Sequence, residues 1–376
     1  MASLAPVSEL IVSPDTEVDT PALVVSEEML QRNIDEMAAF AASVGVSLRP
    51  HIKTHKTPQI ARLQRAAGAV GITCAKVGEA EVMVEQAGID DVLLAYPTIG
   101  EPKVRRLVAL MERARVTVAV DSQAAAEMLS RSMNRHNRTL DVVLEVNTGQ
   151  NRSGVTVGAE TEAMAIEIAR LPDLELTGIM THEGHANSAP PAEMEAIAIA
   201  AGEAMVRTAE AIRNHGIALP TVSVGSTPAA RITPTVPGIT EMRPGTYVFN
   251  DNSAFRYGLL GVERCAARFV ATVVSRSAPD RCVLDTGSKS LAMDPSRGHP
   301  GHGYIVEHPD VRIVKLSEEH AVCSLPEGTD GFAIGDRVEI IPNHICPTVN
   351  LMNELFIVRG GEIVDTWQVT ARGMVR

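Results

Sequence analysis

The sequence has no uninterrupted apolar stretch that approaches the roughly 18 residues of a transmembrane helix, so no membrane span is expected. Its N-terminal segment also lacks the basic start and the apolar run of a signal peptide. Only five cysteines occur in 376 residues, and their scattered positions and odd number argue against a disulfide framework. Together these absences predict a cytoplasmic protein.

Positive charge is also scarce. The chain has 34 Lys and Arg against 46 Asp and Glu, a net charge of -12, so neither nucleic acid nor an anionic membrane surface is expected as a partner. No GxGxxG turn is present, which argues against a doubly wound dinucleotide-binding sheet. What remains is an ordinary globular composition and enough length for a barrel of about 250 residues plus a second domain.

From about residue 22 to 250, β-branched runs alternate with helical runs rich in Ala, Glu and Arg. Several strands are continuous apolar runs such as VLLAY and VVLEV, as expected for parallel strands covered on both faces. Eight strands joined by helices predict an α/β fold, a closed (β/α)8 TIM-type barrel. The predicted strands are Val46–Lys53, Gly71–Lys76, Asp91–Tyr96, Val116–Asp121, Asp141–Asn147, Glu175–His182, Thr221–Ser226 and Met242–Phe249. The predicted helices are Glu27–Ala42, Thr57–Ala67, Gly78–Gln86, Lys103–Arg113, Ala124–Asn134, Ala159–Arg170 and Glu193–Asn214.

The pattern changes after about residue 255, where helical periodicity fades and Gly and Pro separate short strands. We therefore expect a barrel over residues 22–252 and a β domain made of residues 1–21 and 253–376. The predicted strands of the β domain are Ala266–Val274, Arg281–Asp285, Arg312–Lys315, Ala321–Ser324, Arg337–Ile341, Glu354–Val358 and Glu362–Gln368.

Unusual polar residues fall at the C-terminal ends of the predicted barrel strands, where barrel active sites are built. Lys53 ends the first strand and His182 the sixth. Gly225-Ser226-Thr227 follows the seventh strand and Gly245-Thr246-Tyr247 the eighth, which is the usual phosphate site of such barrels. Small residues there let backbone N–H groups approach phosphate oxygens, although a GST tripeptide by itself is usually a simple turn.

The segment Arg49–Lys56, with the sequence RPHIKTHK, concentrates positive charge around Lys53. The plain interpretation is a solvated basic loop. Clustered cations, however, favour the neutral, nucleophilic form of a lysine. If the segment is a strand, Lys53 shares one face with His51 and His55.

A second candidate is the pair His344 and Cys346. In an extended segment, residues two apart point the same way, so both side chains can hold one metal ion. Imidazole and thiolate favour zinc or another borderline metal over magnesium, and two protein ligands leave positions for water or substrate. The alternative is a chance pair in which Cys346 is a small core residue.

Two further loops contain candidate residues. His182 lies in THEGH, which lacks the spacing of an HExxH metal motif, so it is either a loop polar residue or part of a barrel site. Arg152 in NTGQNRSG is either a solvated loop residue or a bidentate partner of a cofactor oxygen.

Taken together, these motifs resemble the D-threonine aldolase/D-serine dehydratase family of pyridoxal-phosphate enzymes, which has the alanine-racemase-like fold. The resemblance rests on RPHIKTHK, GITCAKVGEAE, VNTGQNRSGV, the GST loop, EMRPGTYVFND, LDTGSKS, the His344/Cys346 pair and WQVTARG. These motifs occur in the expected order from Asp19 to the C-terminus. No single one is specific, but their combination is.

The resemblance implies roles for particular residues. Lys53 matches the lysine that carries pyridoxal 5'-phosphate as a Schiff base, and Arg152 the arginine near the cofactor's phenolic oxygen. Gly225, Ser226, Thr227, Gly245 and Thr246 match the phosphate-binding residues, with Tyr247 beside them. His344 and Cys346 match the ligands of a divalent metal, zinc or manganese. The resemblance also implies a homodimer.

The implied reaction is lyase chemistry on a β-hydroxy-D-amino acid. PTVNL after the metal pair and the WQVTARG ending resemble the aldolases, which favours retro-aldol cleavage to glycine and an aldehyde. Cleavage needs a base on the hydroxyl, either His182 or water on the metal. His-x-Cys and GSTP resemble the D-serine dehydratases instead, so dehydration of D-serine or 3-hydroxy-D-aspartate to a keto acid and ammonia is the alternative. An amino-acid racemase or a non-catalytic cofactor-binding protein ranks third.

Overall fold

The computed structural model describes residues 10–256, 258–296, 299–329 and 332–376. Residues 1–9 of the predicted β domain therefore lie outside the described part. Contacts divide the chain into two compact units. Of the described residues, the barrel unit contains those within 35–53, 58–245 and 373–376, and the β unit contains those within 10–34, 54–57 and 246–372. The domain boundaries at residues 21 and 252, which the sequence predicts, remain a prediction.

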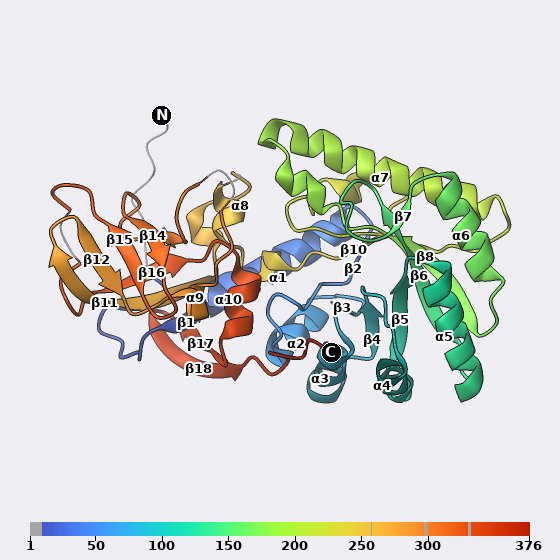
Figure 1. The fold of residues 1–376 in the computed structure, drawn as a ribbon, viewed down its shortest axis with the longest axis horizontal. Coiled ribbons are helices and arrows are strands. Elements are labelled where there is room, and N and C mark those ends of the chain that lie inside the picture. Colours follow the sequence, from blue (N-terminus) through green and yellow to red (C-terminus); the bar gives the residue numbers. More distant parts are fainter. Residues whose placement is uncertain (1–9, 257, 297–298, 330–331) are drawn as a thin grey trace. The chain divides into compact units, whose positions relative to one another are not determined.

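The barrel unit is built on eight parallel strands that pair in chain order (Figure 1). Each predicted barrel strand is present, so the predicted barrel architecture is confirmed. The strands are β2 (Ser47–Leu48), β3 (Ile72–Cys74), β4 (Asp91–Leu94), β5 (Arg115–Val120), β6 (Leu140–Asn147), β8 (Leu174–Met180), β9 (Thr221–Val224) and β10 (Glu241–Met242). A short additional strand, β7 (Val155–Thr156), pairs with β6.

The sheet curls back on itself. β10 pairs with β2 through Met242 and Leu48, and an isolated parallel bridge between His51 and Thr73 connects the β2 segment to β3. The core follows the same curvature: Leu93, Ala119, Val143 and Met180 form one buried cluster across four neighbouring strands. Strands buried on both faces need apolar side chains at successive positions, which explains the continuous apolar runs of the sequence.

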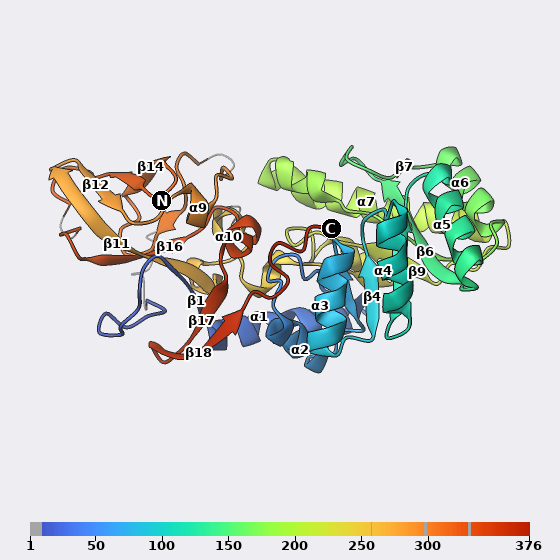
Figure 2. The same ribbon diagram turned by 60° about the horizontal axis from the view of Figure 1, so that its bottom comes forward.

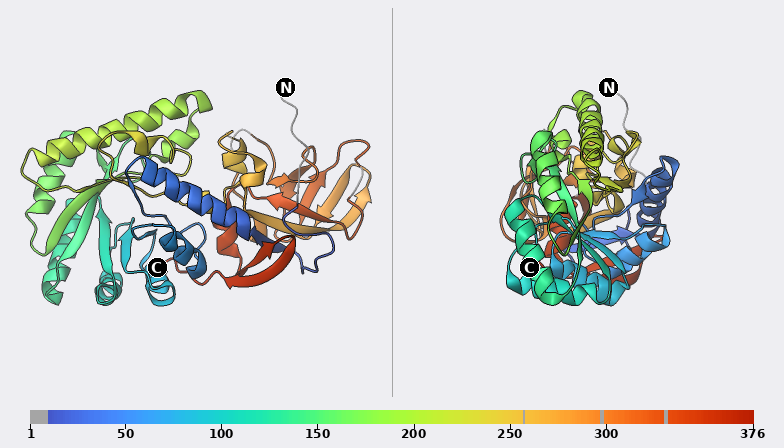
Figure 3. Two further views of the ribbon diagram at one scale, coloured as in Figure 1. Left: turned by 180° about the vertical axis from the view of Figure 1, so that it is seen from behind. Right: turned by 90° about the vertical axis from the view of Figure 1, so that its right-hand side faces the viewer.

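The helices that connect these strands lie outside the sheet (Figure 3, right). They are α2 (Pro58–Ala66), α3 (Val77–Ala87), α4 (Glu101–Met111), α5 (Gln123–His136), α6 (Ala159–Ala169) and α7 (Pro191–Arg213), with the 3-10 turns η1 (Gly184–Ser188) and η2 (Thr233–Thr235). Local signals set their ends: Ser122 Oγ accepts a hydrogen bond from Ala125 N at the start of α5, and Asn137 ends α5 in the left-handed conformation. Among the helices that the structure describes, none combines the length and the hydrophobicity that a membrane span requires.

The β unit contains a second sheet, which includes all seven strands predicted after residue 255 (Figure 2). The strand β1 (Ala22–Ser26) also joins this sheet, between β11 and β17, and helix α1 (Glu27–Ser43) has residues in both units. The other strands are β11 (Ala267–Ala278), β12 (Arg281–Leu284), β13 (Tyr304–Ile305), β14 (Arg312–Leu316), β15 (Ala321–Ser324), β16 (Arg337–Ile341), β17 (Glu354–Arg359) and β18 (Glu362–Gln368). The helical segments are η3 (Thr246–Val248), α8 (Asn252–Arg256), η4 (Val262–Arg264), α9 (Ser288–Leu291) and α10 (Ile345–Leu351).

Two barrel strands are much shorter than predicted. The strand predicted to reach Lys53 ends at Leu48, and the strand predicted to reach Phe249 ends at Met242. A proline follows each end by two residues, Pro50 and Pro244, and proline has no N–H to donate to a neighbouring strand. Lys53 therefore lies in a turn rather than in a strand.

Candidate active site

Lys53 is half-buried in the turn that follows β2, and its backbone N–H donates a hydrogen bond to His51 Nδ1 at 3.3 Å. The predicted shared strand face with His55 is wrong because residues 52–55 form turns. His55 is fully buried in the β unit, where its Nδ1 accepts a hydrogen bond from Thr57 N at 3.1 Å. The basic side chains near Lys53 are thus not brought together on one face of a strand.

His182 lies directly beyond β8, with its Nδ1 against the carbonyl oxygen of Gly225. A carbonyl oxygen only accepts, so Nδ1 holds the proton and donates it, and Nε2 keeps its lone pair. Burial, then the charges of Lys53, Arg152 and Arg243, lower the pKa of His182 to about 3, against the opposing effect of the Gly225 hydrogen bond. The imidazole is therefore neutral at physiological pH, and three cations lie close enough to influence it.

The loop after β6 approaches His182 from a neighbouring strand. Asn147 organises this loop, because its Oδ1 accepts hydrogen bonds from Gly149 N and Asn151 N, each at 3.0 Å. Arg152 and His182 line the same small cavity. The loop after β8 packs closely against this site: a Cβ added at Gly184 would lie 2.7 Å from His182 Nε2. A side chain at position 184 is therefore expected to displace the imidazole.

The two predicted phosphate-binding segments, at residues 225–227 and from residue 245, meet in the barrel unit. Gly245 N donates a hydrogen bond to Thr227 Oγ1 at 3.1 Å, and Ser226 is buried beside them. A Cβ on Gly225 would lie 2.9 Å from the Cβ of Arg243, so glycine permits this close approach. Thr246 and Tyr247 continue this segment within the β unit.

Sequence reasoning missed two charged residues beneath this site. Arg243 is 5% exposed and donates hydrogen bonds to Thr181 O, at 2.6 Å, and to Ser223 Oγ. Glu183 is 1% exposed and accepts a hydrogen bond from Gly225 N at 3.0 Å. The signal available in the sequence was the position of Arg243 directly after a strand, in MRPG.

The barrel site suits an anionic cofactor that makes many hydrogen bonds. Lys53, Arg152 and Arg243 supply positive charge around one neutral histidine. Gln150 Oε1 and His185 Nδ1 are buried there without a hydrogen-bond partner, and buried polar atoms of this kind usually have one. Backbone N–H groups and hydroxyls, as found at residues 225–227 and 245, are of the kind that binds phosphate. Here the N–H groups of Gly225 and Gly245 donate within the protein, to Glu183 and Thr227 Oγ1.

In the β unit, the predicted pair His344 and Cys346 does come together, although not in an extended segment as expected. His344 is extended and caps α10, whereas Cys346 lies in the first turn of that helix, and their side chains share a hydrogen bond. The thiol also lies 3.2 Å from Thr54 Oγ1. Burial lowers the pKa of His344, but Cys346, Asp294 and Asp251 outweigh it and raise this pKa to about 9.

These donors suit a metal ion that is completed by other ligands. No group of three or more His, Cys, Asp or Glu side chains suited to a metal occurs in the described parts of the chain. Imidazole and thiol at one point are still the donor set of a borderline metal such as zinc. The surrounding anions that raise the pKa of His344 also favour a bound cation.

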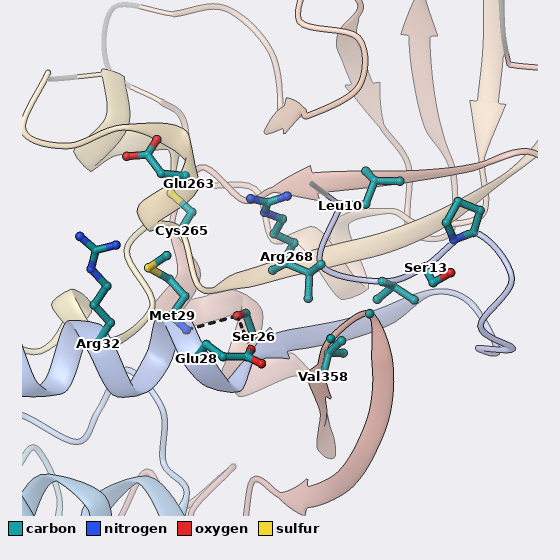
Figure 4. Close-up of a pocket in the computed structure, with 15 residues that line it drawn as sticks. Leu10, Ser13, Ser26, Glu28, Met29, Arg32, Glu263, Cys265, Arg268 and Val358 are labelled. Atoms are coloured by element: carbon teal, nitrogen blue, oxygen red, sulfur yellow. Dashed lines mark hydrogen bonds between the residues drawn. The ribbon is translucent and has the colours of Figure 1, made fainter. Parts of the chain in front are cut away.

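A cavity of about 810 Å³ lies elsewhere in the β unit (Figure 4). The side chains of Met29, Arg32, Glu263 and Arg268 are among those that line it. None of the predicted cofactor or metal residues takes part. Cavity size therefore does not locate the chemistry of this protein.

A parallel α/β barrel with Lys53, Arg152 and the segments at residues 225–227 and 245 beyond its strands, together with a β-sheet unit in the same chain, corresponds to the class of alanine-racemase-like pyridoxal-phosphate enzymes. Residues 25–253 match the family model for the alanine racemase N-terminal domain, and residues 266–358 match a putative serine dehydratase domain. The chain therefore belongs to the family defined by the alanine racemase N-terminal domain.

Its relatives include lyases. The chain is 34% identical to a D-threonine aldolase of Arthrobacter sp., with 96% of this chain and 95% of that protein covered. The crystal structure of D-threonine aldolase from Filomicrobium marinum is 35% identical, with a TM-score of 0.86 and coverage of 96% and 97%. A cysteine-to-alanine mutant of D-threo-3-hydroxyaspartate dehydratase, described as metal-free, is 30% identical with a TM-score of 0.87 and coverage of 93% and 97%. The protein is thus a lyase of the pyridoxal-phosphate-dependent type.

Proposed function

We propose that this protein is a pyridoxal-phosphate- and divalent-metal-dependent lyase that cleaves a β-hydroxy-D-amino acid into glycine and an aldehyde. The observation that carries the proposal is the gathering of Lys53, Arg152 and Arg243 around the neutral His182. The similarity to two D-threonine aldolases supports the substrate class. The homodimer implied by the sequence resemblance is part of the same proposal.

Several residues would hold the cofactor. Lys53 would attach it covalently, and Arg152 would pair with the phenolic oxygen of its ring. The phosphate would be bound by Gly225, Ser226, Thr227, Gly245 and Thr246, with Tyr247 beside them. When bound, the cofactor supplies an electron sink for the bond that breaks at Cα.

His344 and Cys346 would bind the metal, with zinc and manganese as the candidates. The metal-free description of the related dehydratase's cysteine-to-alanine mutant supports a thiol ligand in this family. When bound, the metal supplies a Lewis acid that lowers the pKa of the substrate's β-hydroxyl.

His182 would act as the base in aldol cleavage. Its Nδ1–H is engaged by the Gly225 carbonyl, so Nε2 is the atom that would accept the hydroxyl proton. The negative charge of the bound cofactor would offset the effect of the three cations and raise the pKa of His182 from its low value. The contact of Nδ1 with Gly225 supports Nε2 as the ring nitrogen of this proposed step.

Dehydration to a keto acid and ammonia is the second candidate. Cys346 favours it, because the aldolase branch usually has aspartate at the corresponding metal position. In that reaction Lys53, rather than His182, would take a proton, and it would take it from Cα. The two candidates therefore assign the decisive proton transfer to different residues of the barrel unit.

Product identification separates the two reactions. The purified, metal-supplemented holoenzyme would be incubated with D-threonine, D-phenylserine, D-serine and 3-hydroxy-D-aspartate, with and without a chelator. We expect glycine plus an aldehyde, with activity lost on chelation and restored by metal. Keto acid plus ammonia would move the protein to the dehydratases, and full activity in the chelator would remove the metal from the proposal.

A further inference from the structure

An acidic side chain contacts the proposed metal ligand from outside the His-x-Cys motif. Asp294 Oδ2 lies 2.5 Å from His344 Nδ1. The two residues are 50 positions apart in the sequence, so no local pattern links them. Both side chains are about half exposed, 43% for His344 and 48% for Asp294. An exposed ion pair of this kind typically stabilises a fold by only about 0–1 kcal/mol, so fold stability is a weak reason for the contact.

The backbone around Asp294 is held by the residue that precedes His344. Asn343 is 4% exposed, and its Nδ2 donates hydrogen bonds to Asp294 O at 3.1 Å and to Gly301 O at 2.9 Å. Its Oδ1 accepts from Gly303 N at 2.9 Å and from Asn252 Nδ2 at 2.8 Å. This buried amide uses both donors and its acceptor. The main chain at Asp294 is thereby fixed relative to the main chain at His344.

The orientation of the histidine follows from this arrangement. An ionised carboxylate accepts hydrogen bonds only, so His344 Nδ1 holds a proton and donates it to Asp294. In the metal-free protein the charged imidazole also carries a proton on Nε2. Loss of that proton, with Nδ1–H still donated to Asp294, would leave the lone pair on Nε2 for a metal. Histidine ligands in metal sites almost always have their other nitrogen bound to a carboxylate, carbonyl or water in this way. Asp294 contacts Nδ1, on the other side of the ring from Nε2, so it is not placed to bind the same metal ion as Nε2.

We propose that Asp294 is a positioning residue that sets the tautomer and the ring orientation of His344, so that Nε2 and the Cys346 thiolate bind one divalent cation together. This inference rests on the proposed metal-dependent function and deepens it. It adds a residue that no motif in the sequence indicated. It also predicts a specific order of metal affinities among variants.

The test is a titration of chelator-stripped holoenzyme with Co²⁺, which reports thiolate ligation by its absorption spectrum. Asp294→Ala is expected to weaken Co²⁺ binding by about 10–100-fold, the usual cost of losing such an outer partner. Asp294→Asn is expected to lie between this variant and the wild type, since its amide oxygen still accepts from Nδ1–H. His344→Ala should weaken binding more than either. Asp280→Ala, which removes a carboxylate from the exposed turn between β11 and β12, is the control and should match the wild type.

Two further readouts distinguish positioning from folding. The thermal midpoint of the metal-free protein and the absorption of the bound cofactor should be the same in Asp294→Ala and wild type. The inference is overturned if Asp294→Ala binds Co²⁺ within about threefold of the wild type while His344→Ala does not bind it. It is also overturned if both Asp294 variants lose thermal stability along with affinity. A wild-type protein that gives no Co²⁺–thiolate spectrum would instead overturn the metal-dependent function itself, and this inference with it.

Discussion

Two histidines in different units show how strongly neighbours determine the chemistry of one residue type. In the barrel unit, burial and the charges of Lys53, Arg152 and Arg243 lower the pKa of His182 to about 3. In the β unit, burial also lowers the pKa of His344, but its acidic neighbours and Cys346 raise it to about 9. The first imidazole is held neutral and the second favours its charged form. Two predicted site histidines thus differ by the sign of the charge around them.

The contrast indicates what each region is suited to bind. Cations around a neutral base stabilise an anion, as the phosphate of the cofactor requires. Anions and a thiol around an imidazole stabilise a cation, as a divalent metal requires. Experiments that alter either charge environment will therefore test the assignment of cofactor to the barrel and of metal to the β unit.

The largest effect is expected from removing the amine of Lys53. Lys53→Ala should lose the visible absorption band of the covalently bound cofactor and at least about a thousandfold of activity, since a covalent catalytic group is removed. Spectra and initial rates measure both losses. Lys76→Ala is a matched control, because Lys76 also follows a barrel strand but its ammonium lies 3.5 Å from the centre of the Tyr96 ring. Loss of the band in Lys76→Ala and its retention in Lys53→Ala would transfer the attachment to Lys76.

The barrel could be predicted from sequence because its determinants are local. Parallel strands covered on both faces must be continuously apolar, and the connecting helices have apolar periodicity and clear end signals, such as Ser122 and Asn137 around α5. Strand ends were less predictable. The predicted first strand extends to Lys53, but Pro50 interrupts its hydrogen bonding, so the expected face shared by Lys53 and His55 does not exist.

The site was predictable only where a motif marks it. Short motifs predict Lys53 and His344 as site residues, but contacts between residues distant in sequence also shape the two regions. Asp294 reaches His344 over 50 residues, and Arg243 contacts Thr181 over 62. Such pairs depend on the packing of strands and loops, which composition and spacing do not specify.

A smaller effect is expected on acid stability, through His182 in the cofactor-free protein. Its pKa of about 3 in the folded state lies below the usual unfolded value of about 6.5. Between these values only the unfolded state binds the proton, so stability is lost as the pH falls from about 6.5 towards 3. His182→Gln cannot titrate and keeps an N–H for the Gly225 carbonyl. From pH 7 to 5 the wild type should lose about 2 kcal/mol more than this variant.

Urea unfolding of both apo-proteins at several pH values measures this difference. The addition of inorganic phosphate is expected to reduce it, because a bound anion would offset the three cations near His182. Parallel stability curves for wild type and His182→Gln would show that neither burial nor the nearby cations lower the pKa of this histidine. The conclusion that the surroundings of His182 in the barrel unit hold it neutral would then be wrong.

The smallest effect is expected in the β unit, with the opposite sign. Burial first, and then the charge of Glu339, raise the pKa of Glu307 to about 7, although backbone hydrogen bonds to its carboxylate oppose the shift. Because the unfolded value is about 4.5, the folded state alone binds the proton between pH 4.5 and 7, and stability is lost as the pH rises through this window. Glu307→Gln keeps an acceptor for Glu339 N, which lies 2.9 Å from Oε1, but cannot ionise. Between pH 5 and 8 the wild type should therefore lose about 1 kcal/mol more stability than the variant, a value reduced for partial solvent access. Urea unfolding would then show opposite pH dependences for the contributions of His182 and Glu307. Equal pH slopes for wild type and Glu307→Gln would instead leave the two histidines as the only evidence that the units differ in charge environment.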